Sequence, residues 1–178
     1  QGTEGAVGAV DRLTFEILKE MEEQPTLVVW LFDQSGSLQR QRREIRDRFD
    51  RIYTELGIAQ DSGAKGFRRD DSDKPLLTSI IGFGSQVKLY TEEPIDDLNE
   101  IKQIVQDIEP DSSGEEKVFT AITSAVDKYK SLCRRRGDRG PQRKVLFVVV
   151  TDEKGDDENL LENSISSCRK WGIPVYVI

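Results

Sequence analysis

The chain has 178 residues, close to the size of one average domain, and its apolar runs, such as 145–150, are far shorter than the roughly 20 residues of a membrane-spanning helix. It contains no histidine, which excludes Ser-His-Asp and Cys-His catalysis, histidine general bases and His-ligated zinc. The net charge of -7 argues against nucleic acid as a partner, because a protein that binds phosphates needs a basic surface.

The first half of the chain predicts a helix, a buried strand and a second helix. Apolar residues at three- and four-residue intervals predict an amphipathic helix over about residues 8–23, which Pro25 ends. The continuously apolar run 26–32 is typical of a strand buried on both faces. A helix over about 38–56 follows, with one face rich in charges that we expect to be exposed and to pair with one another. The arginines of that face are Arg40, Arg42, Arg43, Arg46, Arg48 and Arg51.

The second half predicts a hairpin, helices and two further strands. A polar loop over 59–74 comes first, and a hairpin of strands 77–83 and 86–90 follows it. Two helices are then predicted, over about 95–108 and 120–135. The last predicted elements are a strand at 145–151, a helix over 161–171 and a strand at 173–178. This alternation predicts an α/β fold with a doubly wound, mostly parallel sheet, one antiparallel edge strand and helices on both faces. Since the chain ends on a strand, either a last helix is missing or helix 8–23 covers that place.

Polar residues collect where the two most apolar strands end. Ligands of doubly wound sheets bind beyond the carboxyl ends of the strands, so the loops there are the places to examine. The oxygen-bearing residues in and beside these loops are Asp33, Ser35 and Ser37 after the first strand, Asp152 after strand 145–151, and Thr120 near the start of the helix that precedes that strand. Hydroxyl and carboxylate oxygens without nitrogen or sulfur suit a hard cation, Mg²⁺ or else Mn²⁺. The alternative is that these residues serve only as helix caps and turn residues.

Three motifs carry a resemblance to a known family. They are Asp33-Gln34-Ser35-Gly36-Ser37 at the end of the first buried strand, Thr120 with Ala125 and Val126 shortly after it, and Thr151-Asp152 at the end of a later buried strand. Together they resemble the metal-ion-dependent adhesion site (MIDAS) of von Willebrand factor A (vWA) domains. The resemblance implies a vWA-type domain over 26–178 behind an N-terminal helical lead-in of residues 1–25, without the family's final helix and strand.

The same resemblance implies roles for the site residues. Ser35, Ser37 and Thr120 would touch the metal directly, and Asp33 and Asp152 would act largely through water. A Glu or Asp of a protein partner would complete the coordination of the ion. Secretion or membrane anchoring outside the cytoplasm, in a bacterial protein, is expected on the same ground.

The sequence departs from the family pattern in the last of these loops. The family commonly has Gly after the third-loop Asp, but Glu153 stands there, with Asp156 and Asp157 close behind. These acids form a possible additional acidic site, which would bind a second cation, tighten binding of the first, or repel an acidic ligand. Elsewhere in the chain, Cys133 and Cys168 are expected to be free thiols, with a disulfide as the alternative if their Cα atoms lie within about 7 Å.

The leading functional hypothesis is a binding module that uses a metal to capture an acidic group of a partner, without catalysis. One alternative is an adaptor subunit of an ATPase-linked assembly. The other is a Mg²⁺-dependent phosphohydrolase with Asp33 as nucleophile. That class of enzyme needs a second acid two residues later, and this chain has Ser35 there.

Overall fold

The computed structural model describes residues 2–62, 75–134 and 142–178. Within these residues the sheet has five strands, in the order β3-β2-β1-β4-β5. The strands are β1 (Thr26–Asp33), β2 (Leu76–Phe83), β3 (Val87–Leu89), β4 (Lys144–Val150) and β5 (Val175–Val177). β3 pairs antiparallel with β2 at the edge, and the other pairs are parallel. The predicted fold class is therefore confirmed.

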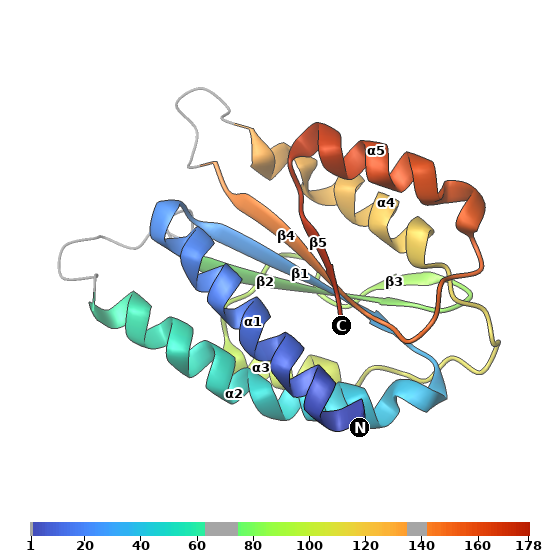
Figure 1. Cartoon of the computed structure of the whole chain (residues 1–178), viewed down its shortest axis with the longest axis horizontal. Coiled ribbons are helices and arrows are strands. Elements are labelled where there is room, and N and C mark those ends of the chain that lie inside the picture. The colour runs from blue at the N-terminus through green and yellow to red at the C-terminus, as the bar shows by residue number, and fades with distance from the viewer. Residues whose placement is uncertain (1, 63–74, 135–141) are drawn as a thin grey trace.

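Helices cover both faces of the sheet (Figure 1). They are α1 (Gly2–Glu23), α2 (Gln39–Ser62), α3 (Leu98–Gln106), α4 (Val118–Tyr129) and α5 (Leu161–Trp171). The first three pack on one face and the last two on the other, so the core consists of two apolar layers separated by the sheet. Because side chains alternate along a strand, Trp30 of β1 faces the α1–α3 layer and Leu31 faces the α4–α5 layer. Every residue of β1 is buried, as its apolar run predicts.

Helix α1 belongs to this core. Its Val10, Leu13 and Ile17 are buried in the same layer as Trp30, and Tyr176 of β5 packs against that layer. The N-terminal helix thus covers part of the sheet face that it shares with α2 and α3. The division of the chain into a lead-in of residues 1–25 and a domain of residues 26–178 stays a prediction.

Several predicted boundaries are wrong by a few residues. The helix predicted over 38–56 begins with a 3₁₀ turn at Gly36–Leu38 and continues as α2 to Ser62, so the predicted loop 59–74 starts later, and its residues 63–74 lie outside the described part. The helix predicted over 95–108 is shorter, because Asp97 caps α3 by accepting a hydrogen bond from the backbone N–H of Glu100 at 3.0 Å. The helix predicted over 120–135 starts earlier, at Val118, and tightens into a 3₁₀ turn at Lys130–Cys133. Periodicity locates the centre of a helix better than its ends.

Both cysteines are free thiols, as expected. Cys168 is buried and Cys133 is half-buried, and burial raises the pKa of both thiols.

Candidate metal centre

Asp33 lies at the centre of the polar residues where β1 ends. It is the last residue of the strand and is fully buried. Its Oδ1 accepts a hydrogen bond from the backbone N–H of Ser35 at 2.8 Å, and its Oδ2 accepts one from the hydroxyl of Thr151 at 2.9 Å. Since Thr151 directly follows β4, the carboxylate of Asp33 joins the ends of two parallel strands.

The turn after Asp33 brings two hydroxyl groups together. The Oγ atoms of Ser35 and Ser37 lie 3.1 Å apart, with Ser35 half-buried and Ser37 exposed. The carbonyl of Ser35 accepts the N–H of Leu38 at 3.2 Å, which starts the 3₁₀ turn leading into α2. The buried side chain of Leu38 fixes this turn to the core. The structure therefore brings Asp33, Ser35 and Ser37 together, as the motif predicts.

Arg42 is buried under the turn that carries Ser35 and Ser37, so the prediction that this arginine is exposed is wrong. Its Nη1 donates to the carbonyl of Asp33 at 2.6 Å and to that of Ser35 at 3.0 Å, and the residue is only 3% exposed. Desolvation lowers its pKa, although the charge of Asp33 opposes this effect. A signal was present in the sequence, because Arg42 lies four residues after Leu38 and three before Ile45 on the apolar face of α2.

Other arginines on the same helix do pair with neighbouring acids. Arg40 pairs with Glu44 at 3.1 Å and Arg51 pairs with Glu55 at 3.1 Å, both one helical turn apart. The prediction of a self-paired charged face is therefore correct for these residues and wrong for Arg42.

Thr120 lies in the first turn of α4, where its polar groups bind Asp157. The hydroxyl of Thr120 donates to Oδ2 of Asp157 at 2.6 Å, and its backbone N–H donates to the same atom at 2.7 Å. The N–H of Phe119 donates to Oδ1 of Asp157 at 3.1 Å. Asp157 thus caps α4 from a different loop, which satisfies N–H groups that have no partner within the helix. Direct contact between Thr120 and a cation at Asp33 stays a prediction.

The remaining acids of the β4–α5 loop differ in their surroundings. Oδ2 of Asp156 accepts the N–H of Glu116 at 2.7 Å, and the N–H of Asp156 donates to the carbonyl of Glu116 at 2.8 Å. Asp152 and Glu153 have exposed side chains, and the N–H of Glu153 donates to the hydroxyl of Thr151 at 3.2 Å. Asp156 and Asp157 therefore hold neighbouring backbone in place, and Asp152 and Glu153 point into solvent beside the site.

Glu116, which the sequence reasoning missed, is a buried acid in the loop before α4. It is only 7% exposed, and its buried Oε2 has no hydrogen-bond partner among the described residues. Desolvation, followed by repulsion from Asp33, Glu153, Asp152 and Asp156, raises the pKa of Glu116 to about 7. In the sequence Glu116 is one of many acids in a loop, and nothing local distinguishes it.

The loop that carries Glu116 is tied to the strand ends. The N–H of Asp111 donates to the carbonyl of Gln34 at 2.8 Å, and the N–H of Lys117 donates to that of Gly84 at 3.1 Å. The carboxylate of Asp111 accepts hydrogen bonds from the N–H groups of Ser113 at 2.7 Å and Ser85 at 2.9 Å. Hydrogen bonding by the side chain of Ser113, followed by these N–H groups, holds the pKa of Asp111 well below its usual range. Three loops therefore meet at this edge of the sheet.

The donor set fits a hard divalent cation. It consists of the carboxylate of Asp33 and the hydroxyls of Ser35 and Ser37, with Asp152 and Glu116 nearby. Among the residues that the structure describes, no three or more Asp, Glu, Cys or His side chains converge closely enough to hold an ion. An ion bound at Asp33 would therefore need the serine hydroxyls as well as carboxylates.

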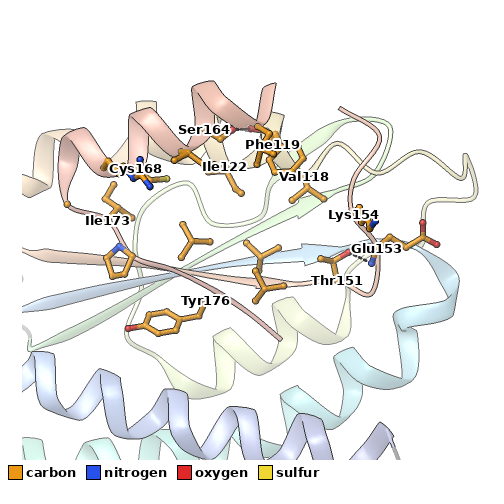
Figure 2. Close-up of a pocket in the computed structure, with 18 of the residues that line it drawn as sticks. Val118, Phe119, Ile122, Thr151, Glu153, Lys154, Ser164, Cys168, Ile173 and Tyr176 are labelled. Atoms are coloured by element: carbon orange, nitrogen blue, oxygen red, sulfur yellow. Dashed lines mark hydrogen bonds between the residues drawn. The ribbon is translucent and has the colours of Figure 1, made fainter. Parts of the chain in front are cut away.

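A groove lies at the β5 edge of the sheet (Figure 2). It has a volume of about 720 Å³ and lies between α4, α5, β4 and β5. Apolar side chains such as Ile122, Cys168 and Ile173 line it, and Thr151 and Glu153 stand at one end. Thr151 also bonds Asp33, so the groove begins beside the candidate metal centre.

Comparison with known proteins gives the family and the fold. The sequence-family model of the von Willebrand factor type A domain matches residues 28–178 of this chain. A search of curated proteins finds no match. No helix in the described part of the chain combines the length and apolar character needed to cross a membrane.

Solved structures with similar folds come from several kinds of protein. Proximal thread matrix protein 1 from the mussel byssus, in a form described as having a zinc-occupied MIDAS motif, has a TM-score of 0.57 and 18% identity, with 86% of this chain and 37% of that chain covered. BatB from Bacteroides thetaiotaomicron has a TM-score of 0.56 and 16% identity, with 85% and 65% covered. The vWF domain of the type V pili tip protein Mfa5 from Porphyromonas gingivalis has a TM-score of 0.51 and 12% identity, with 74% and 39% covered.

Because these identities are low, the similarity to these structures establishes the fold alone. This chain spans less than two thirds of the length of each of those proteins. The family match covers most of the chain and includes all three loops that meet around Asp33. The chain belongs to the von Willebrand factor type A domain family.

Proposed function

We propose that this domain binds a protein partner through a divalent cation, Mg²⁺ or Mn²⁺, held where β1 and β4 end. The observation that carries the proposal is the arrangement of Asp33, Ser35 and Ser37, in which a buried carboxylate stands beside two hydroxyls whose Oγ atoms are 3.1 Å apart. Ser35 and Ser37 are neutral ligands, so they leave most of the positive charge of the ion for an incoming group. A Glu or Asp of the partner is the ligand that this charge favours.

The surroundings of Asp33 favour binding over catalysis. A nucleophilic carboxylate needs a free oxygen that faces the substrate. Both oxygens of Asp33 already accept hydrogen bonds, from the N–H of Ser35 and the hydroxyl of Thr151, and the residue is fully buried. The phosphohydrolase alternative is therefore weaker than the binding module. An adaptor role in an ATPase-linked assembly would use the same site and differ only in the partner.

Display outside the cell is part of the proposal. A pilus tip protein is among the structures of similar fold, and adhesion at a surface is a use to which a metal-dependent capture site is suited. A proteomic fractionation of the source cells, with the domain detected by antibody in surface and cytoplasmic fractions, tests this point.

The test of the metal site compares thermal unfolding in EDTA with unfolding at rising Mg²⁺ or Mn²⁺. The wild type should show a saturable rise in Tm, because an ion that binds only the folded state adds about 2.7 kcal/mol of stability at 100 times its Kd. Ser35→Ala should lose this rise, and Ser166→Ala, which truncates an exposed serine on α5, should keep it. A wild type whose Tm is the same in EDTA and in saturating metal would refute the proposal.

A further inference from the structure

We infer that Glu116 supplies a carboxylate ligand to the cation held at Asp33, Ser35 and Ser37. The inference rests on the proposed function, since it concerns the same ion. It assigns a ligand to the loop before α4 that the three sequence motifs do not contain.

The burial of Glu116 is the first argument. The residue is only 7% exposed, and its Oε2 is buried without a hydrogen-bond partner among the described residues. A buried carboxylate without partners costs free energy, and the usual compensation is a hydrogen bond, an ion pair or a metal. Within the described structure, no cation is paired with Glu116. A divalent cation would supply the missing partner.

The position of Glu116 is the second argument. Its loop lies at the edge of the sheet where β1 ends, because the N–H of Asp111 donates to the carbonyl of Gln34 at 2.8 Å. The repulsion of its carboxylate by Asp33 agrees with this position. Its main chain is fixed there, because its N–H donates to Asp156 at 2.7 Å and its carbonyl accepts the N–H of Asp156 at 2.8 Å. The next residue is held as well, through the hydrogen bond from Lys117 to Gly84. The backbone that carries Glu116 is thus fixed to the loops that follow β2 and β4.

The chemistry of the donor set is consistent with this role. The carboxylate of Glu116 and the hydroxyls of Ser35 and Ser37 are all oxygen ligands, which suit Mg²⁺ and Mn²⁺, and the ions keep the rest of their shell as water or partner oxygens. Glu116 would bring one negative charge into direct contact with the ion, which still keeps positive charge to attract a partner's acid. That remaining charge is smaller than at a site whose direct ligands from the chain are the two serines alone.

The experiment measures Mn²⁺ binding by calorimetry to the wild type, Glu116→Gln, Ser35→Ala and Glu115→Gln. Glu115→Gln is the matched control, because it removes the same charge from the adjacent exposed residue. Glu116→Gln should weaken Mn²⁺ binding by at least about tenfold, the lower end of the loss seen even for residues that act one layer outside the metal ligands. Glu115→Gln should bind Mn²⁺ as the wild type does. Circular dichroism spectra establish that each variant is folded.

A second measurement, the relaxivity of water protons, distinguishes a Glu116 that binds the ion directly from one that only attracts it by its charge. The relaxivity of water protons per bound Mn²⁺ rises when a water molecule replaces a protein ligand on the ion. Glu116→Ala, which removes the ligand oxygens altogether, should give a higher relaxivity than the wild type, measured where each is saturated with protein. An unchanged relaxivity would mean that Glu116 acts only through its charge, and the inference would be wrong.

The outcomes distinguish this inference from the proposed function. If Ser35→Ala weakens binding and Glu116→Gln binds as tightly as the wild type, the site exists and the assignment of Glu116 is overturned. If the wild type itself does not bind Mn²⁺, both the proposed function and the inference fail. Weaker binding in both Ser35→Ala and Glu116→Gln and higher relaxivity in Glu116→Ala, with Glu115→Gln unchanged, support the inference.

Discussion

Glu116→Gln should stabilise the metal-free domain at pH 8. In the folded state the pKa of Glu116 is raised to about 7 from an ordinary value of 4.5, first by desolvation and then by repulsion from Asp33 and nearby acids. Between pH 4.5 and pH 7 the folded state therefore keeps a proton that the unfolded state releases. Stability falls as the pH rises through this window, and the cost is complete above pH 7. Glutamine carries no charge and removes this cost.

The size of the effect follows from the two pKa values. One pKa unit corresponds to about 1.4 kcal/mol, so the difference between 4.5 and about 7 sets an upper limit of about 3 kcal/mol. Asp152, Glu153 and Asp156 have exposed side chains, and solvent and salt screen their repulsion. We therefore expect a gain of about 1–2 kcal/mol at pH 8, which is roughly 2–8 °C in Tm for a domain of this size. At pH 5 the gain should shrink to about 0.5 kcal/mol, because most of the cost has not yet appeared.

The assay is urea unfolding of the wild type and the variant in EDTA at pH 5 and pH 8, followed by circular dichroism. Glu115→Gln serves as the control and should change the free energy of unfolding by less than about 0.5 kcal/mol at both pH values, because it is an exposed residue. The reasoning would be refuted if Glu116→Gln had the same effect at both pH values, or if it were no more stable than the wild type at pH 8.

Two further predictions concern residues that hold the loops. Arg42→Leu should lower the free energy of unfolding by about 2–3 kcal/mol, because the carbonyls of Asp33 and Ser35 lose a charged donor in a buried place. Urea unfolding checks this, with the exposed Arg43→Leu as control; equal losses in the two variants would contradict it. Asp157→Ala should cost about 1–2 kcal/mol by removing the cap of α4. Thermal unfolding in EDTA checks this against the exposed Glu158→Ala, and a loss under about 0.5 kcal/mol would show that α4 does not need the cap.

The local part of the candidate site could be predicted because its residues are neighbours in the chain. Asp33, Ser35 and Ser37 lie within five residues of one another, and the end of a buried strand fixes where they point. Arg42 was within reach of the same reasoning, since its place on the apolar face of α2 was visible in the spacing. Its charge favoured the prediction of an exposed residue, because arginine is usually exposed.

The other contacts could not be predicted because they join distant residues. Asp157 caps α4 from 37 and 38 residues away, and Asp33, which repels Glu116, lies 83 residues before it in the chain. No pattern in the neighbouring sequence predicts which loop a given acidic side chain will contact. The positions of the loops depend on how α4 and α5 pack against the sheet.

The sequence by itself determined the order of the elements, the α/β class, the antiparallel edge and the Asp33 motif. These follow from apolar periodicity and from turn residues, which act over a few neighbouring positions. Only the tertiary structure decided that α1 shares a face with α2 and α3, that Asp157 binds Thr120, and that Glu116 is buried and repelled by Asp33. The physical reason is that burial and hydrogen-bond partners depend on which segments meet once the sheet has formed, and chain connectivity does not specify this locally.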